Sequence, residues 1–279
     1  MSSIYKSAAG EREVLRRYEE TLAAWPVPAE HLRVPTREGE TFVLACGPAD
    51  APPLVLLHGA GSNAAMWAGD VPVWAEHFRV YAVDVIGEPG LSAPARPALG
   101  SGAYARWLDD VLDHLHLDRV AIVGASLGGW LALDYATQRP ERVSRIAVLC
   151  PGGVGRQKMA VLLTALLYKP FGRWGKYRSL SAVAGVDVLA EPAVADYLAL
   201  VFTHFRPRTQ RLPVFPDAAL RTLTMPIRVV VGAQDAMFDS ADTARRIRRT
   251  ATGAEVVVLP GVGHSITGQA EPIRRFLAE

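Results

Sequence analysis

The chain has 279 residues, half of them hydrophobic, and a formal net charge of +2. This length suits one large α/β domain, and the low charge excludes the strongly basic face of a nucleic-acid-binding protein. We expect no membrane partner either, because the longest apolar stretch, about 159–168, is too short to span a bilayer.

The first part of the chain alternates between helical and strand patterns. Apolar residues at helical spacing predict a first helix that ends before Pro26. Two short strands joined by a turn at 37–39 follow within residues 31–46. The next elements are a buried strand at 53–57, a helical segment at about 64–77 and a strand at 78–84.

The alternation continues after a strongly amphipathic helix at 104–115. Strands are predicted at 119–125, 142–149, 227–231 and 255–259, with helices after residue 126, at 241–250 and from 271 onward. Nearly continuous Val, Ile and Leu runs alternating with helices predict an α/β fold whose mostly parallel sheet is covered on both faces.

Residues 151–215 break this alternation, which divides the chain into a core of 1–150 and 216–279 and an inserted helical lid. The insertion carries apolar residues that include Leu163 and Phe202. We expect most of them to form a small helical core and a minority to face a substrate. The segment is also rich in Arg and Lys, which leaves open an arginine that binds a substrate carboxylate.

The run Gly124-Ala-Ser126-Leu-Gly128 directly follows a predicted strand and opens a helix. A sharp strand-to-helix turn with glycines at the close contacts exposes the serine hydroxyl, as in the nucleophile elbow of serine hydrolases. The helix N-terminus behind the serine offers unpaired N–H groups to a developing negative charge. Ser126 is therefore the candidate nucleophile.

A serine nucleophile needs a base, and the base needs an acceptor on its other nitrogen. His264 lies in a glycine-rich loop after the last predicted strand, and Asp235 follows the strand before it. We predict His264 as base and Asp235 as acid. Asp239 is the main alternative for the acid, and His204, in the lid, is a weaker alternative for the base.

Two backbone N–H groups must bind the oxyanion of the tetrahedral intermediate. We expect one from Leu127, directly after the nucleophile, and one from Ala60 in the glycine-rich loop after the 53–57 strand. His58 precedes this loop and is expected to brace it by hydrogen bonds. The candidate substrate contacts are Trp130, Met66, Leu163 and Phe202.

These motifs make the chain resemble the lid-bearing esterases, lipases and C–C hydrolases of the α/β-hydrolase fold superfamily. The resemblance is carried, in order, by His58-Gly59-Ala60-Gly61, by the Gly124–Gly129 elbow, by Gly232-Ala-Gln-Asp235 and by Gly263-His264. It implies Ser126, Asp235 and His264 as a catalytic triad, with Ala60 and Leu127 as oxyanion donors.

The chain departs from the superfamily at one point. Many members carry Asp-x-Arg-Gly-x-Gly-x-Ser after the fourth strand. This chain has Asp84-Val-Ile-Gly87-Glu88-Pro89-Gly90-Leu-Ser92, which lacks the arginine and contains a Glu-Pro pair. The shape of the pocket near this loop does not follow from the resemblance.

We expect a serine carboxylesterase that acts on a small or medium, partly apolar ester and uses neither a metal nor an organic cofactor. The alternatives are a C–C bond (meta-cleavage product) hydrolase or lactonase, a cofactor-free perhydrolase, and a small-molecule receptor without turnover. Cys46 and Cys150 have no metal-ligand neighbours at useful spacing, so we expect two reduced cysteines. The N-terminus lacks a hydrophobic signal core, and we therefore expect a cytoplasmic enzyme. We expect it to be a monomer or a homodimer.

Overall fold

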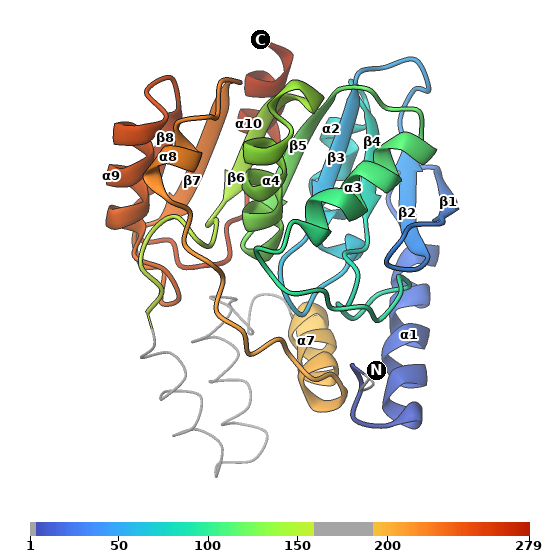
Figure 1. Cartoon of the computed structure of the whole chain (residues 1–279). Coiled ribbons are helices and arrows are strands. Elements are labelled where there is room, and N and C mark those ends of the chain that lie inside the picture. The colour runs from blue at the N-terminus through green and yellow to red at the C-terminus, as the bar shows by residue number, and fades with distance from the viewer. Residues whose placement is uncertain (1–3, 159–191) are drawn as a thin grey trace.

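Eight strands form one sheet in the computed structural model, which describes residues 4–158 and 192–279 (Figure 1). Their order across the sheet is β1-β2-β4-β3-β5-β6-β7-β8. The strands are β1 (Ala29–Val34), β2 (Thr41–Cys46), β3 (Pro53–Leu57), β4 (Arg79–Val83), β5 (Val120–Ala125), β6 (Val143–Leu149), β7 (Ile227–Gly232) and β8 (Glu255–Leu259).

The sheet is parallel from β4 to β8 and antiparallel at one edge, where β1 pairs with β2 and β2 with β4. The central strand β5 is buried along its whole length, as expected for a parallel strand covered on both faces. The predicted α/β fold with a mostly parallel sheet is therefore confirmed. The carboxyl ends of β3, β5, β7 and β8 all lie at one edge of the sheet, where ligands of such folds bind.

Helices cover both faces of the sheet (Figure 1). One face packs against α3 (Ala103–His114), α4 (Leu127–Gln138), α8 (Asp217–Leu220) and α9 (Ser240–Thr250). The other packs against α1 (Ala8–Ala23), the 3-10 helix η1 (Ala64–Trp67), α2 (Val71–Trp74) and α10 (Ala270–Ala278). A second 3-10 helix, η2 (Pro140–Arg142), follows α4.

The prediction of a helical segment at about 64–77 is wrong in the extent of the helix. Only η1 and the four-residue α2 form there. Gly69 lies between them, and Pro72 at the start of α2 has no backbone N–H to continue an earlier helix. Trp67 and Trp74 are nonetheless fully buried, with ring centroids 5.7 Å apart, and anchor the segment to the sheet.

The helix α7 (Pro192–His204) lies beside α1 at the end of the molecule where the N-terminus is found (Figure 1). Tyr5 pairs with Phe205 in an antiparallel bridge, and the Lys6 ammonium donates hydrogen bonds to the carbonyls of Phe202 and Thr203 at the end of α7. The lid boundaries at 151 and 215 stay a prediction, because much of the predicted lid lies outside the described residues.

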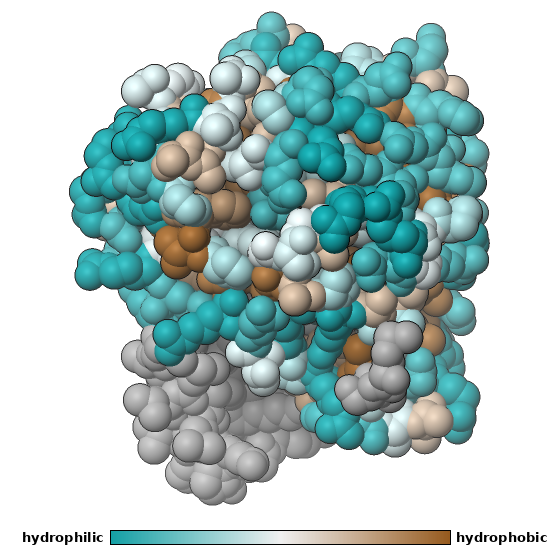
Figure 2. Space-filling model, viewed as in Figure 1, coloured by the Kyte–Doolittle hydropathy of each residue, from teal (hydrophilic) through white to brown (hydrophobic). Residues whose placement is uncertain are grey.

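The outer surface is largely hydrophilic on the face shown in Figure 2. This agrees with helices that turn one apolar side toward the sheet, as in α3 and α9. Within residues 4–158 and 192–279, no helix combines the length and the apolarity that crossing a membrane requires.

Candidate active site

Ser126 lies at a strained turn between β5 and α4. Its backbone has φ 52° and ψ −106°, a conformation that L-residues rarely adopt. The turn brings backbone segments so close together that a Cβ at Gly124 would lie 2.4 Å from the Gly128 carbonyl oxygen. A Cβ at Gly128 would lie 1.9 Å from the carbonyl oxygen of Leu57 on β3. The two glycines of the motif are thus required by contacts, as the sequence analysis predicted.

The side chain of His264 connects Ser126 to Asp235. Its Nε2 atom lies 3.0 Å from Ser126 Oγ, and its Nδ1 atom lies 2.9 Å from Asp235 Oδ2. The structure therefore brings together the three residues proposed as nucleophile, base and acid. The imidazole is 11% exposed, so its charge would be only partly solvated.

The Asp235 carboxylate is buried and fully hydrogen-bonded. Burial alone would raise its pKa, but the hydrogen bond from His264 and the backbone N–H groups of Met237 and Phe238 hold the pKa of Asp235 below its ordinary value. The Phe238 ring packs on the imidazole, with ring centroids 5.3 Å apart. The carboxylate is thus kept ionised and fixed against the imidazole.

The alternative candidates occupy other places. Asp239 caps the N-terminus of α9, where its side chain accepts a hydrogen bond from the Asp242 N–H, and it forms an ion pair with Arg156. The His204 ring lies against Gly10 of α1. Neither side chain contacts the Ser126–His264 pair.

The two predicted oxyanion donors belong to two segments that meet at the serine. Leu127 is the first residue of α4, so its N–H has no acceptor within the helix. Ala60 is exposed in the loop after β3, and this loop lies against the elbow, because a Cβ at Gly59 would be 3.6 Å from Ser126 Cβ. Both amides are therefore available near the serine, and their role as donors stays a proposal.

His58 stabilises the loop after β3 through hydrogen bonds of its buried ring. The buried ring interacts through Nδ1 with the Gly59 carbonyl at 2.8 Å and accepts the Val85 N–H at Nε2 at 2.9 Å. These partners fix the tautomer with the proton on Nδ1, and burial lowers the pKa of His58 to about 4. The bracing role predicted from the sequence is confirmed.

The four predicted substrate contacts fall in different places. Trp130 is buried, stacks on Phe215 and donates its indole N–H to the Pro213 carbonyl, so its side chain belongs to the core. Met66 and Phe202 are 42% and 37% exposed, and their contact with a substrate stays a prediction. Leu163 lies outside the described residues.

Sequence reasoning did not identify what the loop 84–92 contributes. The buried Asp84 carboxylate accepts hydrogen bonds from the Tyr18 hydroxyl and from the N–H groups of Ala64 and Leu91. It thereby ties this loop to α1 and to the segment that follows the Ala60 loop. The visible signal was the departure from the family pattern at Asp84–Ser92, but the partners of these residues come from distant parts of the chain.

Among the described residues, one group of side chains has the composition of a metal site. Ligand atoms of Cys150, Asp235 and His264 all lie within 4.8 Å of one another. Burial, together with the nearby Asp235 charge, raises the pKa of the Cys150 thiol, and a neutral thiol is a poor metal ligand. The Asp235 carboxylate and the His264 imidazole are hydrogen-bonded to each other, an arrangement that suits proton transfer.

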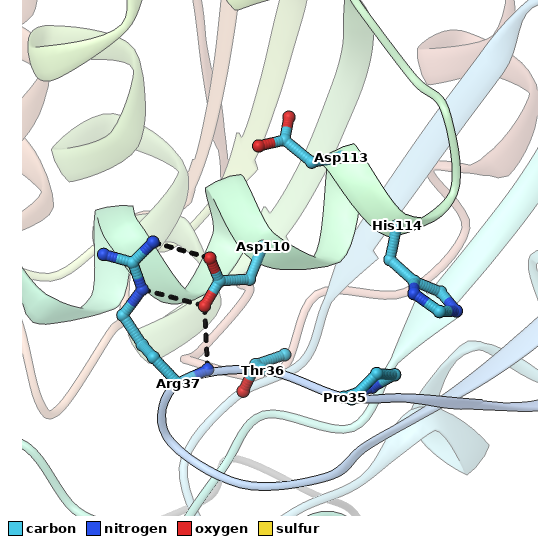
Figure 3. Close-up of a pocket in the computed structure, with 6 residues that line it drawn as sticks. All are labelled: Pro35, Thr36, Arg37, Asp110, Asp113 and His114. Carbon is cyan, nitrogen blue, oxygen red and sulfur yellow. Dashed lines mark hydrogen bonds and ion pairs between the residues drawn. The ribbon is translucent and has the colours of Figure 1, made fainter.

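A surface depression with acidic residues lies at α3, outside this site (Figure 3). Its lining residues are Pro35, Thr36, Arg37, Asp110, Asp113 and His114. Asp110 forms a two-pronged ion pair with Arg37, and Asp113 pairs with Arg142. The charges of the depression are therefore used in surface ion pairs, one of which attaches the start of the 37–39 turn to α3 and the other of which joins α3 to η2.

Comparison with known proteins assigns the family. Residues 54–279 match the model of the alpha/beta hydrolase family. Two similar proteins come from Bacillus subtilis (strain 168). The uncharacterized carboxylesterase nap is 32% identical over 269 residues, covering 90% of this chain and 85% of its own. The carboxylesterase YbfK is 30% identical over 260 residues, covering 90% and 86%.

Solved structures agree with this assignment. The crystal structure of naproxen esterase (carboxylesterase NP) from Bacillus subtilis aligns with a TM-score of 0.84 at 30% identity, over 98% of this chain and 99% of that one. The chain belongs to the alpha/beta hydrolase family, which confirms the resemblance found in the sequence. It is a serine hydrolase of the esterase kind.

Proposed function

We propose that the protein hydrolyses carboxylic esters of small to medium, partly apolar molecules, with Ser126 as nucleophile, His264 as base and Asp235 as acid. The observation that carries this proposal is the continuous chain of hydrogen bonds from Ser126 through His264 to Asp235. The similarity to carboxylesterases supports the same reaction.

The hydrogen-bond partners determine which imidazole nitrogen carries the proton. An ionised carboxylate only accepts hydrogen bonds, so Asp235 selects the tautomer with the proton on Nδ1 of His264. The Nε2 atom is then free to accept the Ser126 hydroxyl proton as Oγ attacks the ester carbonyl. The same nitrogen returns this proton to the leaving alcohol, and a water molecule activated there releases the acid from the acyl-enzyme.

The negative charge on the carbonyl oxygen is bound by the backbone N–H groups of Leu127 and Ala60. Leu127 also lies at the positive end of the α4 dipole, which adds to the stabilisation. Because both donors are backbone groups, their positions depend on the fold around them rather than on their own side chains.

The substrate is a small molecule, and its apolar part is proposed to contact Met66 and Phe202, both large, apolar and more than a third exposed. Arg208 belongs to the predicted lid 151–215, but its guanidinium faces Glu88 and hydrogen-bonds to Tyr104. Its charge is thus already paired with a protein carboxylate, which does not favour a role in binding a substrate carboxylate. A cytoplasmic location and a monomer or homodimer stay predictions from the sequence.

A substrate panel tests this proposal. The purified protein is assayed with p-nitrophenyl esters of increasing acyl length, with a lactone, and with a 2-hydroxy-6-oxo-dienoate. Turnover of the simple esters that disappears in Ser126→Ala supports the esterase. Turnover of the dienoate alone would identify a C–C hydrolase. If a compound of the panel bound but none was turned over, the protein would be a receptor.

A further inference from the structure

The loop that carries Ala60 is hydrogen-bonded to the loop 84–92 at three points. At its start, the ring of His58 accepts the Val85 N–H. At its end, the Asn63 side chain donates to the Pro89 carbonyl over 2.9 Å. Between these points, the N–H of Gly61 donates to Oε2 of Glu88 over 2.7 Å. The Glu-Pro pair that departs from the family pattern thus sits against the predicted oxyanion loop.

Two of these bonds hold the peptide units on either side of Ala60. Peptide units are planar, and those of the described residues are trans, so the C=O and N–H of one unit point in opposite directions. The His58 ring holds the Gly59 carbonyl, which belongs to the unit that carries the Ala60 N–H. Glu88 holds the next unit through the Gly61 N–H. The direction of the Ala60 N–H is therefore set by His58 and Glu88 together.

The Glu88 carboxylate is 1% exposed, and a buried negative charge near an oxyanion would oppose the reaction unless it is balanced. Arg208 supplies the balance. Its side chain is 8% exposed, and its Nε lies 3.8 Å from Oε1 of Glu88, the oxygen that does not bond to Gly61. Burial raises the pKa of Glu88, while the Gly61 N–H, Arg208 and Arg96 act in the opposite direction.

We propose that Glu88 is a positioning residue of the oxyanion hole, which aims the Ala60 N–H through Gly61, and that Arg208 offsets its charge. This inference rests on the proposed esterase function. It differs from a purely structural role because it predicts an effect on the chemical step. Oxyanion donors act mainly in the transition state, so their misplacement lowers kcat more than it changes KM.

Variants at the two positions separate geometry from charge. Glu88→Ala removes the acceptor of the Gly61 N–H and is expected to lower kcat by about 10- to 100-fold, with KM changed by about twofold or less. Glu88→Gln retains an oxygen that accepts this N–H, so it is expected to recover most of the activity. Arg208→Met removes the nearer of the two positive charges that act on the carboxylate and leaves only Arg96, so it is expected to lower kcat by about tenfold. Adding Glu88→Gln to Arg208→Met should restore kcat toward that of Glu88→Gln alone.

The readouts are steady-state hydrolysis of p-nitrophenyl acetate, the rate of inactivation by a fluorophosphonate, and the Tm. Asp134→Asn serves as the control, because Asp134 is also a buried carboxyl but lies on α4 and has no bond to the loop. Its kcat should equal that of the wild type. Exchange of the Gly61 amide hydrogen, followed by NMR, measures the anchoring of the loop without using catalysis, and it should accelerate in Glu88→Ala.

The inference is overturned if Glu88→Ala keeps the wild-type kcat and slow Gly61 exchange, or if the charge-free double variant is no more active than Arg208→Met. Failure of the proposed function looks different. In that case the wild type itself hydrolyses no ester and does not react with the fluorophosphonate, while the Gly61 exchange still reports whether Glu88 holds the loop.

Discussion

The Nε2 atom of His264 lies 3.0 Å from the Oγ of Ser126, although 138 residues separate them in the chain. Strand β5 and the loop after β8 deliver these side chains from two places in the sheet, and Asp235, after β7, holds the imidazole from the other side. The proposed reaction depends on this arrangement, because the serine hydroxyl is a weak nucleophile without the base.

Replacing Asp235 by Asn should remove most of the activity with little change in the fold. The amide still occupies the site, but it no longer selects the His264 tautomer or stabilises the imidazolium. We expect kcat to fall by about 10⁴-fold, as in other triads of this type. Steady-state kinetics on a p-nitrophenyl ester, with circular dichroism to verify the fold, measures this loss.

Asp239→Asn is the matched control, four residues further along the chain. Asp239 caps α9, so this variant should lose at most about 1 kcal/mol of stability and keep its kcat. If Asp239→Asn lost as much activity as Asp235→Asn, the assignment of Asp235 as the catalytic acid would be contradicted.

Replacing Gly128 by Ala should destabilise the protein and abolish activity together. The new Cβ would lie 1.9 Å from the Leu57 carbonyl oxygen, so β3 and α4 must move apart. We expect a loss of about 3 kcal/mol or more in the free energy of unfolding, at the upper end for overpacking, measured by urea denaturation. Gly253→Ala, where a Cβ meets nothing within 4 Å, should leave both properties unchanged.

The buried His58 makes stability depend on pH. Its pKa is lowered from 6.5 to about 4, so the unfolded state takes up a proton first as the pH falls. The stabilising contribution is complete above pH 6.5 and is lost progressively between pH 6.5 and 4. From pH 7 to pH 5 this side chain should cost about 2 kcal/mol of stability.

Urea denaturation of wild type and His58→Gln at pH 7, 6 and 5 isolates this contribution, because glutamine does not titrate and the other groups cancel between the two proteins. The difference in stability between them should shrink as the pH falls. NMR provides a second check, since the His58 ring signals should not titrate between pH 7 and 5. Titration near pH 6.5 would contradict the assignment.

Much of the fold was predictable from the sequence because the central parallel strands are buried on both faces and therefore appear as nearly continuous apolar runs, as in β3 and β5. The elbow was predictable because glycine is needed on both sides of Ser126. The extent of helix in the segment 64–77 was not predictable in this way. Its apolar residues suggest one helix, but Gly69 and Pro72 divide it into η1 and the short α2.

The surroundings of the site were harder to predict from the sequence than the fold. The positions of Ser126, His264 and Asp235 relative to strand ends were visible in the sequence, and the structure brings these residues together. The link between Glu88 and Gly61 was not visible, because it depends on how two loops pack. Trp130 illustrates the opposite limit. It was a candidate substrate contact, but its buried indole donates its N–H to the Pro213 carbonyl.

The reaction of the protein with a fluorophosphonate, followed by mass spectrometry of the peptides, tests the central claim most directly. We predict one covalent adduct per chain, on Ser126, that is absent from Ser126→Ala, together with a loss of ester hydrolysis on the order of a millionfold in that variant. An adduct on a different residue, or ester hydrolysis that persists in Ser126→Ala, would contradict the account.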